Sequence, residues 1–149
     1  MKILFVSSFY PPFELGGWEQ LTQEVAVRLR ARGHETAVLT SRYRADELTA
    51  PEPNVHRVLY LESDDVLHYH PLTFPVKGVR ERRNCQLLAD LVGGFRPDIV
   101  FFHSMWNLPR SLAWYAEQLL PNRVVYYVAG DWPYALNAHE AYWSAGTRR

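Results

Sequence analysis

The residues whose types and spacing best suit chemistry follow the first apolar run of the chain. Residues 3–6 are apolar, and the loop after them carries a Pro-Pro pair and then Gly16 and Gly17, just before an amphipathic segment. Glycines at a helix N-terminus let a ligand approach the backbone, and the free N–H groups and partial positive charge there suit a phosphate. The pair therefore predicts a phosphate site, with a nucleotide sugar as its leading ligand. A simple loop-to-helix turn, with Glu19 capping the N–H groups, is the alternative.

Two further polar residues come directly after apolar segments. His103 follows Phe101 and Phe102, and Asp131 follows an apolar run at 123–128. If both runs are strands, both residues lie at carboxyl ends of strands, where ligands of α/β folds bind. We expect His103 to hydrogen-bond a sugar hydroxyl or a phosphate, and Asp131 to accept hydrogen bonds from an acceptor hydroxyl. A structural histidine and an Asx turn or helix cap are the alternatives.

Neighbouring side chains extend this candidate site. Ser104 and Asn107 are natural helix-capping or sugar-contacting groups. Aromatic residues concentrate in the second half of the chain, and we expect most of them in the core and a minority on an exposed face for a sugar ring or a partner. The predicted acceptor-binding residues are Glu19, Trp106, Asn107 and Trp132.

Two other groups of residues suggest chemistry of a different kind. His68 and His70 could ligate a metal, but no cysteine or carboxylate cluster supports them, so neither a metal site nor a cofactor is predicted. Basic side chains also gather at the start of a predicted helix, at Lys77, Arg80, Arg82 and Arg83. We expect a solvated face there, with an anionic membrane surface or a phosphate-bearing acceptor as the alternative partner.

The composition excludes several classes of protein. The chain has 149 residues, with 16 basic and 16 acidic side chains, and this balance does not support a nucleic-acid binder. One cysteine, Cys85, excludes an internal disulfide framework and fits a reducing compartment. The N-terminal apolar run is too short for a signal peptide, and no stretch approaches a transmembrane length. We expect a cytoplasmic protein, with peripheral contact at the inner face of the membrane as an alternative.

The elements that must position these residues alternate between strand and helix. Strands are predicted at 2–6, 35–40, 55–61, 99–102 and 123–128, and helices at 17–32, 76–92, 109–120 and 135–144. Gly33 ends the first helix and Gly93-Gly94 the second, whereas 41–54 reads as loop and 62–75 has no clear period. Alternation with short apolar strands predicts one α/β domain over 1–149, a Rossmann-like doubly wound, mostly parallel sheet with helices on both faces.

The predicted topology brings the candidate residues together. In the strand order 3-2-1-4-5, the first and fourth strands are neighbours at the switch point, and ligands bind beyond the carboxyl ends there. The loop with Gly16 and Gly17 and the loop with His103 then face one crevice.

With these residues in view, the chain resembles the N-terminal domain of the family-four, GT-B fold, retaining glycosyltransferases, from residue 1 to about 133. The motifs that carry the resemblance are Lys2-Ile3-Leu4-Phe5-Val6, Pro11-Pro12, Gly16-Gly17-x-Glu19, Leu29-x-x-x-Gly33-His34-Glu35-x-Ala37-Val38-Leu39-Thr40 and Pro97-Asp98-Ile99-Val100. The resemblance implies two Rossmann-like domains with a cleft between them, of which this one mainly holds the acceptor.

The resemblance also implies roles for single residues. Gly16 and Gly17 would line the cleft and touch the donor diphosphate. His103 matches the second histidine of a His-x-His that often ends the fourth strand, and it would lie near the transferred sugar. Asp131 looks like the aspartate that commonly follows the fifth strand.

The chain departs from the family pattern at two residues and at one whole domain. Phe101 and Gly130 stand where the family often has histidine, so the identity of the acceptor cannot be inferred from the family. The family's second domain carries basic residues for the donor phosphates and a Glu-x7-Glu motif, which nothing after Pro133 supplies. We therefore expect half of an enzyme, whose missing C-terminal domain stands in cis or on a separate chain.

The resemblance implies transfer of a sugar, with retention and without a metal, from a nucleotide-diphosphate-sugar donor to a glycan, a lipid or a small molecule. The isolated chain would turn over little. A dinucleotide-binding oxidoreductase would need Gly-x-Gly-x-x-Gly in a tight first turn and an acid after the second strand, where this chain has Thr40-Ser41. A non-catalytic module or a truncated relic that binds an acceptor or a partner chain is the remaining alternative.

Overall fold

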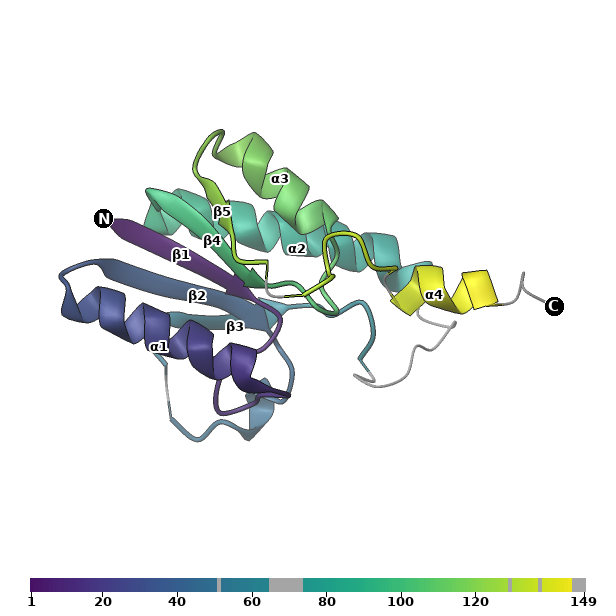
Figure 1. Ribbon diagram of the computed structural model, residues 1–149, viewed down its shortest axis with the longest axis horizontal. Helices are drawn as coiled ribbons and strands as arrows, with labels where there is room; N and C mark the ends of the chain where they lie inside the picture. Colours follow the sequence, from purple (N-terminus) through teal and green to yellow (C-terminus); the bar gives the residue numbers. More distant parts are fainter. Residues whose placement is uncertain (51, 65–73, 129, 137, 146–149) are drawn as a thin grey trace.

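Five parallel strands form one sheet in the computed structural model of this chain (Figure 1). The structure describes residues 1–50, 52–64, 74–128, 130–136 and 138–145. The strands are β1 (Lys2–Ser7), β2 (Glu35–Ser41), β3 (Val55–Leu59), β4 (Ile99–Ser104) and β5 (Val124–Tyr126). The helices are α1 (Gly17–Ala31), α2 (Phe74–Phe95), α3 (Ser111–Leu119) and α4 (Ala138–Ala145), with a short 3₁₀ helix η1 (Ala45–Glu47) after β2.

The strand order is β3-β2-β1-β4-β5, and every neighbouring pair is parallel. This confirms the predicted order and places β1 beside β4 at the switch point. The pairing of β1 with β4 shifts by one residue near its end, because Val6 faces Phe102 whereas Ser7 faces Ser104. His103 lies at this irregularity, at the carboxyl edge of the sheet.

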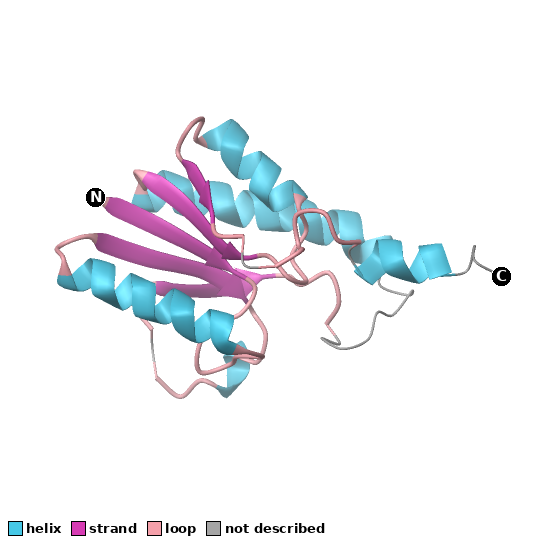
Figure 2. Ribbon diagram, viewed as in Figure 1, coloured by secondary structure: helices cyan, strands magenta, loops and turns pink. Residues whose placement is uncertain are grey.

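Helices cover both faces of the sheet, as predicted (Figure 2). Successive strand side chains point to opposite faces, so β1 contributes Leu4 and Val6 to one core and Ile3 and Phe5 to the other. Helix α1 packs on the second core through Ala26, whereas α2 and α3 pack on the first. Helix α4 lies beyond the carboxyl ends of the strands (Figure 1).

Helix α2 runs past the glycines that were predicted to end it. Gly93 and Gly94 lie inside the last turns of α2, which ends at Phe95, so the predicted stop is wrong. Glycine costs about 1 kcal/mol in a helix interior, but Phe95 packs on the core at the end of α2. The chain turns instead at Arg96, which has a positive φ of 53° and donates its N–H to the Val92 carbonyl oxygen at 2.9 Å.

Strand β3 is shorter than the predicted strand at 55–61. Asn84, fully buried in α2, bonds both backbone groups of Tyr60: its Oδ1 accepts from the Tyr60 N–H and its Nδ2 donates to the Tyr60 carbonyl oxygen, both at 2.8 Å. A side chain therefore takes the place of the strand ladder after Leu59. Helix α3 begins at Ser111 rather than at 109, and β5 covers 124–126 of the predicted 123–128.

Candidate functional site

A cleft of about 190 Å³ opens beyond the carboxyl ends of β4 and β5. The residues that line it are Trp18, His103, Ser104, Trp106, Gly130, Asp131 and Trp132. Four of the predicted site residues are therefore brought together, from segments far apart in the sequence. Trp18 was not predicted as a site residue, although its position directly after the two glycines was a usable signal.

His103 is the most deeply placed polar residue of the cleft. Only 3% of it is exposed, and its Nδ1 lies 2.7 Å from Oγ1 of Thr22 on α1. Its ring stacks on Tyr127 with centroids 4.7 Å apart and meets the edge of Phe101 at 5.8 Å. Burial lowers the pKa of His103 below its ordinary 6.5, which favours a neutral imidazole at neutral pH.

Gly16, the N-cap of α1, and Gly17, its first residue, are exposed, and the fold does not require a glycine at either position. Gly16 has φ −166°, an extended conformation, and a Cβ there would meet only Glu19, at 3.9 Å. A Cβ on Gly17 would meet no atom within 4 Å, and neither glycine has a positive φ. The missing side chains therefore leave open space at the helix N-terminus, beside Trp18 of the cleft, which is what close approach of a ligand needs.

Glu19 and Asn107 make contacts within the protein. Glu19 is 5% exposed, and its Oε2 accepts the Gly16 N–H at 3.1 Å, which is the capping role given above as the alternative. Asn107, with a positive φ of 61°, holds Ser63 in the loop after β3: its Oδ1 accepts from the Ser63 N–H at 2.9 Å and its Nδ2 donates to the Ser63 carbonyl oxygen at 2.8 Å. Contact of either residue with an acceptor stays a prediction.

Asp131 presents its side chain to solvent at the rim of the cleft. Its carbonyl oxygen, rather than its carboxylate, forms the following turn by accepting the N–H groups of Tyr134 at 3.0 Å and Ala135 at 2.7 Å. Within the described part of the chain the carboxylate has no hydrogen-bond partner, so it is available to a ligand hydroxyl. The neighbouring Trp132 holds its Nε1–H buried without a partner, a donor that the described residues leave unsatisfied.

Exposed indole rings form the walls of the cleft. Trp18 is 46% exposed, and its ring centroid lies 6.3 Å from that of Tyr127. Trp106 is 50% exposed, and its ring centroid lies 6.2 Å from that of Phe9. Each of these tryptophans therefore lies beside another aromatic side chain while about half of its surface is exposed to solvent. Flat apolar surfaces beside hydrogen-bonding groups are suited to a sugar ring.

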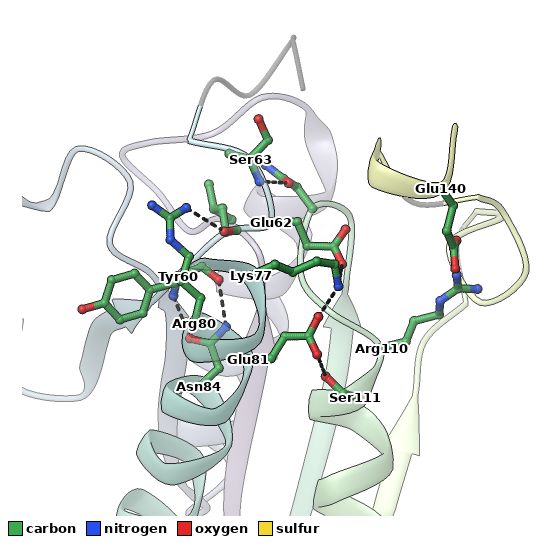
Figure 3. A network of polar contacts seen from close by, with 12 residues as sticks. Tyr60, Glu62, Ser63, Lys77, Arg80, Glu81, Asn84, Arg110, Ser111 and Glu140 are labelled. Carbon is green, nitrogen blue, oxygen red and sulfur yellow. Dashed lines mark hydrogen bonds and ion pairs between the residues drawn. The ribbon is translucent and has the colours of Figure 1, made fainter. Parts of the chain in front are cut away.

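The predicted basic patch divides into two parts. Lys77 pairs with Glu81 and lies 3.6 Å from Glu62 (Figure 3). Arg80 reaches Asp64 at 2.6 Å. These ion pairs tie the loop after β3 to α2, and burial raises the pKa of the Glu62 carboxyl. The other two basic residues of the patch, Arg82 and Arg83, have exposed side chains.

The same network reaches α3 and the residues beyond β5. Glu81 accepts a hydrogen bond from Ser111 Oγ at 3.3 Å, and Arg110 pairs with Glu140 of α4 at 2.7 Å (Figure 3). Polar contacts therefore fix the start of α3, which follows the loop that carries Trp106.

Three further residues, His68, His70 and Cys85, bear on metal binding and on thiol reactivity. His68 and His70 lie outside the described residues, and no group of three His, Cys, Asp or Glu within the described ranges is placed to hold a metal ion. Cys85 is half-buried, packs against the core, and has its pKa raised chiefly by burial, which disfavours a reactive thiolate.

Arg57 is a structural residue of the site that sequence reasoning missed. Its side chain is 5% exposed, pairs with Glu52 at 2.6 Å, and donates to the carbonyl oxygens of Tyr10 at 2.9 Å and Pro11 at 2.5 Å. These bonds fix the loop that leads to the glycines. Nothing in the sequence around Arg57 indicates the carbonyl oxygens that it reaches, because they lie more than 40 residues away along the chain.

Comparison with known proteins identifies the family of this chain. The search of curated proteins finds no significant match. The model of the family described as "Glycosyl transferase 4-like domain" matches residues 16–149, and it confirms the resemblance predicted from the motifs. Since this match spans most of the chain and its parallel α/β sheet agrees with one half of a GT-B fold, the chain belongs to the glycosyl transferase 4-like domain family.

Proposed function

We propose that residues 1–149 form the acceptor-side half of a glycosyltransferase that moves a sugar from a nucleotide-diphosphate-sugar donor to a hydroxyl acceptor with retention. The observation that carries the proposal is the cleft itself. It brings His103, Asp131 and three indole rings to the carboxyl edge of the sheet, beside the glycine-opened start of α1. Family membership supports the reaction class, and the side chains of the cleft support a carbohydrate ligand.

The proposed roles of these residues follow from the charge that develops during sugar transfer. In sugar transfer the departing diphosphate gains negative charge, and the N-terminus of α1 at Gly16 and Gly17 offers N–H groups and a positive helix end to stabilise it. Asp131 accepts the hydrogen bond of the acceptor hydroxyl, and Trp106 and Trp132 hold the acceptor by ring contact, with Glu19 and Asn107 as the further acceptor-side residues. His103 lies near the transferred sugar. No metal takes part in this proposal.

The donor is shared with a second domain in this proposal. A domain with a Glu-x7-Glu motif, in cis or on a separate chain, would hold the nucleotide, and closure of the two domains would exclude water and align donor and acceptor. The purified 149-residue protein is expected to transfer little or no sugar. Clear sugar transfer by this chain alone would contradict the division of roles.

The test is to map binding on the purified protein by backbone amide NMR. A panel of uridine, guanosine and adenosine diphosphate sugars and of neutral methyl glycosides is titrated into wild type, Asp131→Asn and the matched control Asp90→Asn on α2. Saturable shifts at the cleft that weaken in Asp131→Asn and persist in the control support the proposal. Binding elsewhere, or to none of the panel, favours the alternative of a non-catalytic module.

We also propose peripheral contact with the cytoplasmic face of a membrane through the start of α2. Three apolar side chains are exposed there, Phe74, Val76 and Val79, close to the exposed Arg82 and Arg83. Exposed apolar and basic side chains on one helix suit an anionic bilayer surface. None of the described helices is long and apolar enough to cross a membrane.

The membrane contact predicts co-sedimentation with vesicles that contain anionic lipid and none with purely zwitterionic vesicles. Replacing Arg82 and Arg83 by glutamate should lower the vesicle partition coefficient by at least about thirtyfold, since each of the two basic residues contributes about 1 kcal/mol near an anionic surface. Arg123→Glu, an exposed residue between α3 and β5, serves as the control. Equal binding by all three proteins would contradict a contact through α2.

A further inference from the structure

The contact between α1 and β4 beneath the cleft determines which hydrogen-bonding group His103 offers. Thr22 is fully buried on the inward face of α1. Its Oγ1 lies 2.9 Å from the carbonyl oxygen of Trp18, one turn earlier, and 2.7 Å from Nδ1 of His103 on β4. The threonine hydroxyl is therefore shared between a carbonyl oxygen and an imidazole nitrogen.

The protons of these three groups can be assigned by counting. A carbonyl oxygen only accepts, so the single hydroxyl proton of Thr22 is donated to Trp18. Thr22 Oγ1 then accepts, and the donor must be the Nδ1–H of His103. A neutral imidazole carries one N–H, so Nε2 is left with a lone pair and can only accept.

The surroundings of the ring support this arrangement. Tyr127 stacks on the ring of His103, and Phe101 meets it edge-on, so the ring plane is held on two sides. Thr22 is the one polar partner that the described residues provide for His103, and His103 lines the cleft. Nδ1 is thus occupied, and Nε2 is the nitrogen left for a ligand.

We propose that Thr22 is a positioning residue, which holds the proton of His103 on Nδ1 and so presents Nε2 to the cleft as a hydrogen-bond acceptor. For its ligand the inference rests on the proposed function. An acceptor-only nitrogen selects a hydroxyl, which donates, and not an ionised phosphate oxygen, which only accepts. Two parts of one ligand would therefore bind at different places, a hydroxyl group at His103 and the diphosphate at the start of α1.

The tautomer can be measured without any ligand. Two-bond ¹H–¹⁵N correlation spectra of the imidazole rings, recorded on the purified 149-residue protein at pH 7.5, separate the protonated from the unprotonated nitrogen. We expect His103 in the Nδ1–H form, with His34 and His56 as internal references. A predominant Nε2–H form in the wild type would overturn the inference, and this result does not depend on any variant.

Two variants then test whether Thr22 is the cause. Thr22→Val has nearly the shape of threonine but cannot accept a hydrogen bond, so the tautomer ratio of His103 should reverse toward Nε2–H. Thr22→Ser keeps the hydroxyl and should keep the Nδ1–H form. Unchanged tautomers in a folded Thr22→Val protein, with dispersed amide spectra, would show that Thr22 is not the positioning group.

Titration with two probes separates this inference from the proposed function. A neutral methyl glycoside should shift Nε2 of His103, whereas inorganic phosphate should leave it unchanged. If no glycoside binds while the Nδ1–H form is present, the proposed function loses support and the role of Thr22 stands. If phosphate shifts Nε2 by protonating His103 at pH 7.5, the selection of a hydroxyl is wrong.

Discussion

Single residues of the cleft differ in whether the fold itself accounts for them. Glu19 and Asn107 satisfy backbone groups of their own protein, so stability alone would retain them. Gly17 and the carboxylate of Asp131 make no stabilising contact with the described residues. A Cβ on Gly17 would meet open space, and the Asp131 carboxylate has no hydrogen-bond partner among the described residues. Residues of the second kind are the ones whose replacement should separate ligand binding from stability.

Gly17→Ala tests this separation at the start of α1. The added Cβ meets no protein atom, so the free energy of unfolding should stay equal or rise by about 0.5–1 kcal/mol, as expected for glycine replaced by alanine in a helix. Binding of pyrophosphate, used as a mimic of the leaving group, should weaken. Both quantities can be measured on one sample, by urea denaturation and by NMR titration.

Gly33→Ala is the matched control for this substitution. Gly33 has φ +84°, which costs about 1–2 kcal/mol for a residue with a Cβ, so this variant should lose stability and keep its pyrophosphate affinity. If the two variants behave alike, the space above Gly17 has no role in binding.

His103 predicts how stability depends on pH. Its pKa in the folded protein is lowered from 6.5 by burial, so below that pH the unfolded chain binds more protons than the folded one. Stability should therefore be fully present above pH 6.5 and decrease as the pH falls toward the lowered pKa. The slope should disappear in His103→Gln, and urea denaturation at a series of pH values measures it. An equal slope in both proteins would assign it to other groups.

At the scale of elements, the sequence patterns predicted the centres of strands and helices better than their ends. Apolar runs located β1, β2, β4 and β5, and partial alternation of apolar and polar residues located β3. The ends depended on contacts from distant residues, such as Asn84 bonding Tyr60 and Phe95 packing beyond two glycines. No local pattern contains those contacts.

The candidate site was likewise predictable only in part. His103 and Asp131 were found because strand ends are functional positions in this topology, and the sheet order brings their loops together. The hydroxyl of Thr22 and the guanidinium of Arg57 could not be found, because each acts on a segment that only the folded chain brings near. Donor and acceptor positions depend on side-chain directions that spacing does not determine.

Asn107 links the loop after β4 to the loop after β3, and its replacement should loosen both. Asn107→Gly keeps the positive φ but removes two hydrogen bonds to Ser63, so stability should fall by about 1–3 kcal/mol. Asn107→Ala should cost about 1 kcal/mol more, because a Cβ disfavours that conformation. Urea denaturation measures both, and a glycine variant as stable as wild type would show that the clamp contributes nothing.

At the scale of the whole molecule, the two helical layers share one sheet. Strand β1 places Leu4 in the core under α2 and α3 and Phe5 in the core under α1, so neither layer can lose its packing without affecting the other. The domain should therefore unfold in a single transition, in spite of its two cores.

Leu88→Ala tests this coupling. Leu88 is fully buried, so its truncation should lower the free energy of unfolding by about 2–5 kcal/mol. Circular dichroism and tryptophan fluorescence should still report one coincident transition. Leu136→Ala, where the leucine is 58% exposed, should change stability by less than about 0.5 kcal/mol. Two separate transitions in the Leu88 variant would show that the layers unfold independently.

The central place of β1 has a consequence for the nascent chain. β1 leaves the ribosome before the other four strands and can pair with β2 early, but its other edge pairs with β4. The bond from the Lys2 N–H to Asp98 joins residues 96 positions apart. Until residue 104 has been synthesised, β1 is an edge strand, although its apolar sequence suits a central one. Its free edge can then pair with other chains. Slow translation before β4, or a chaperone that covers β1, would then decide how much of the protein reaches its native sheet.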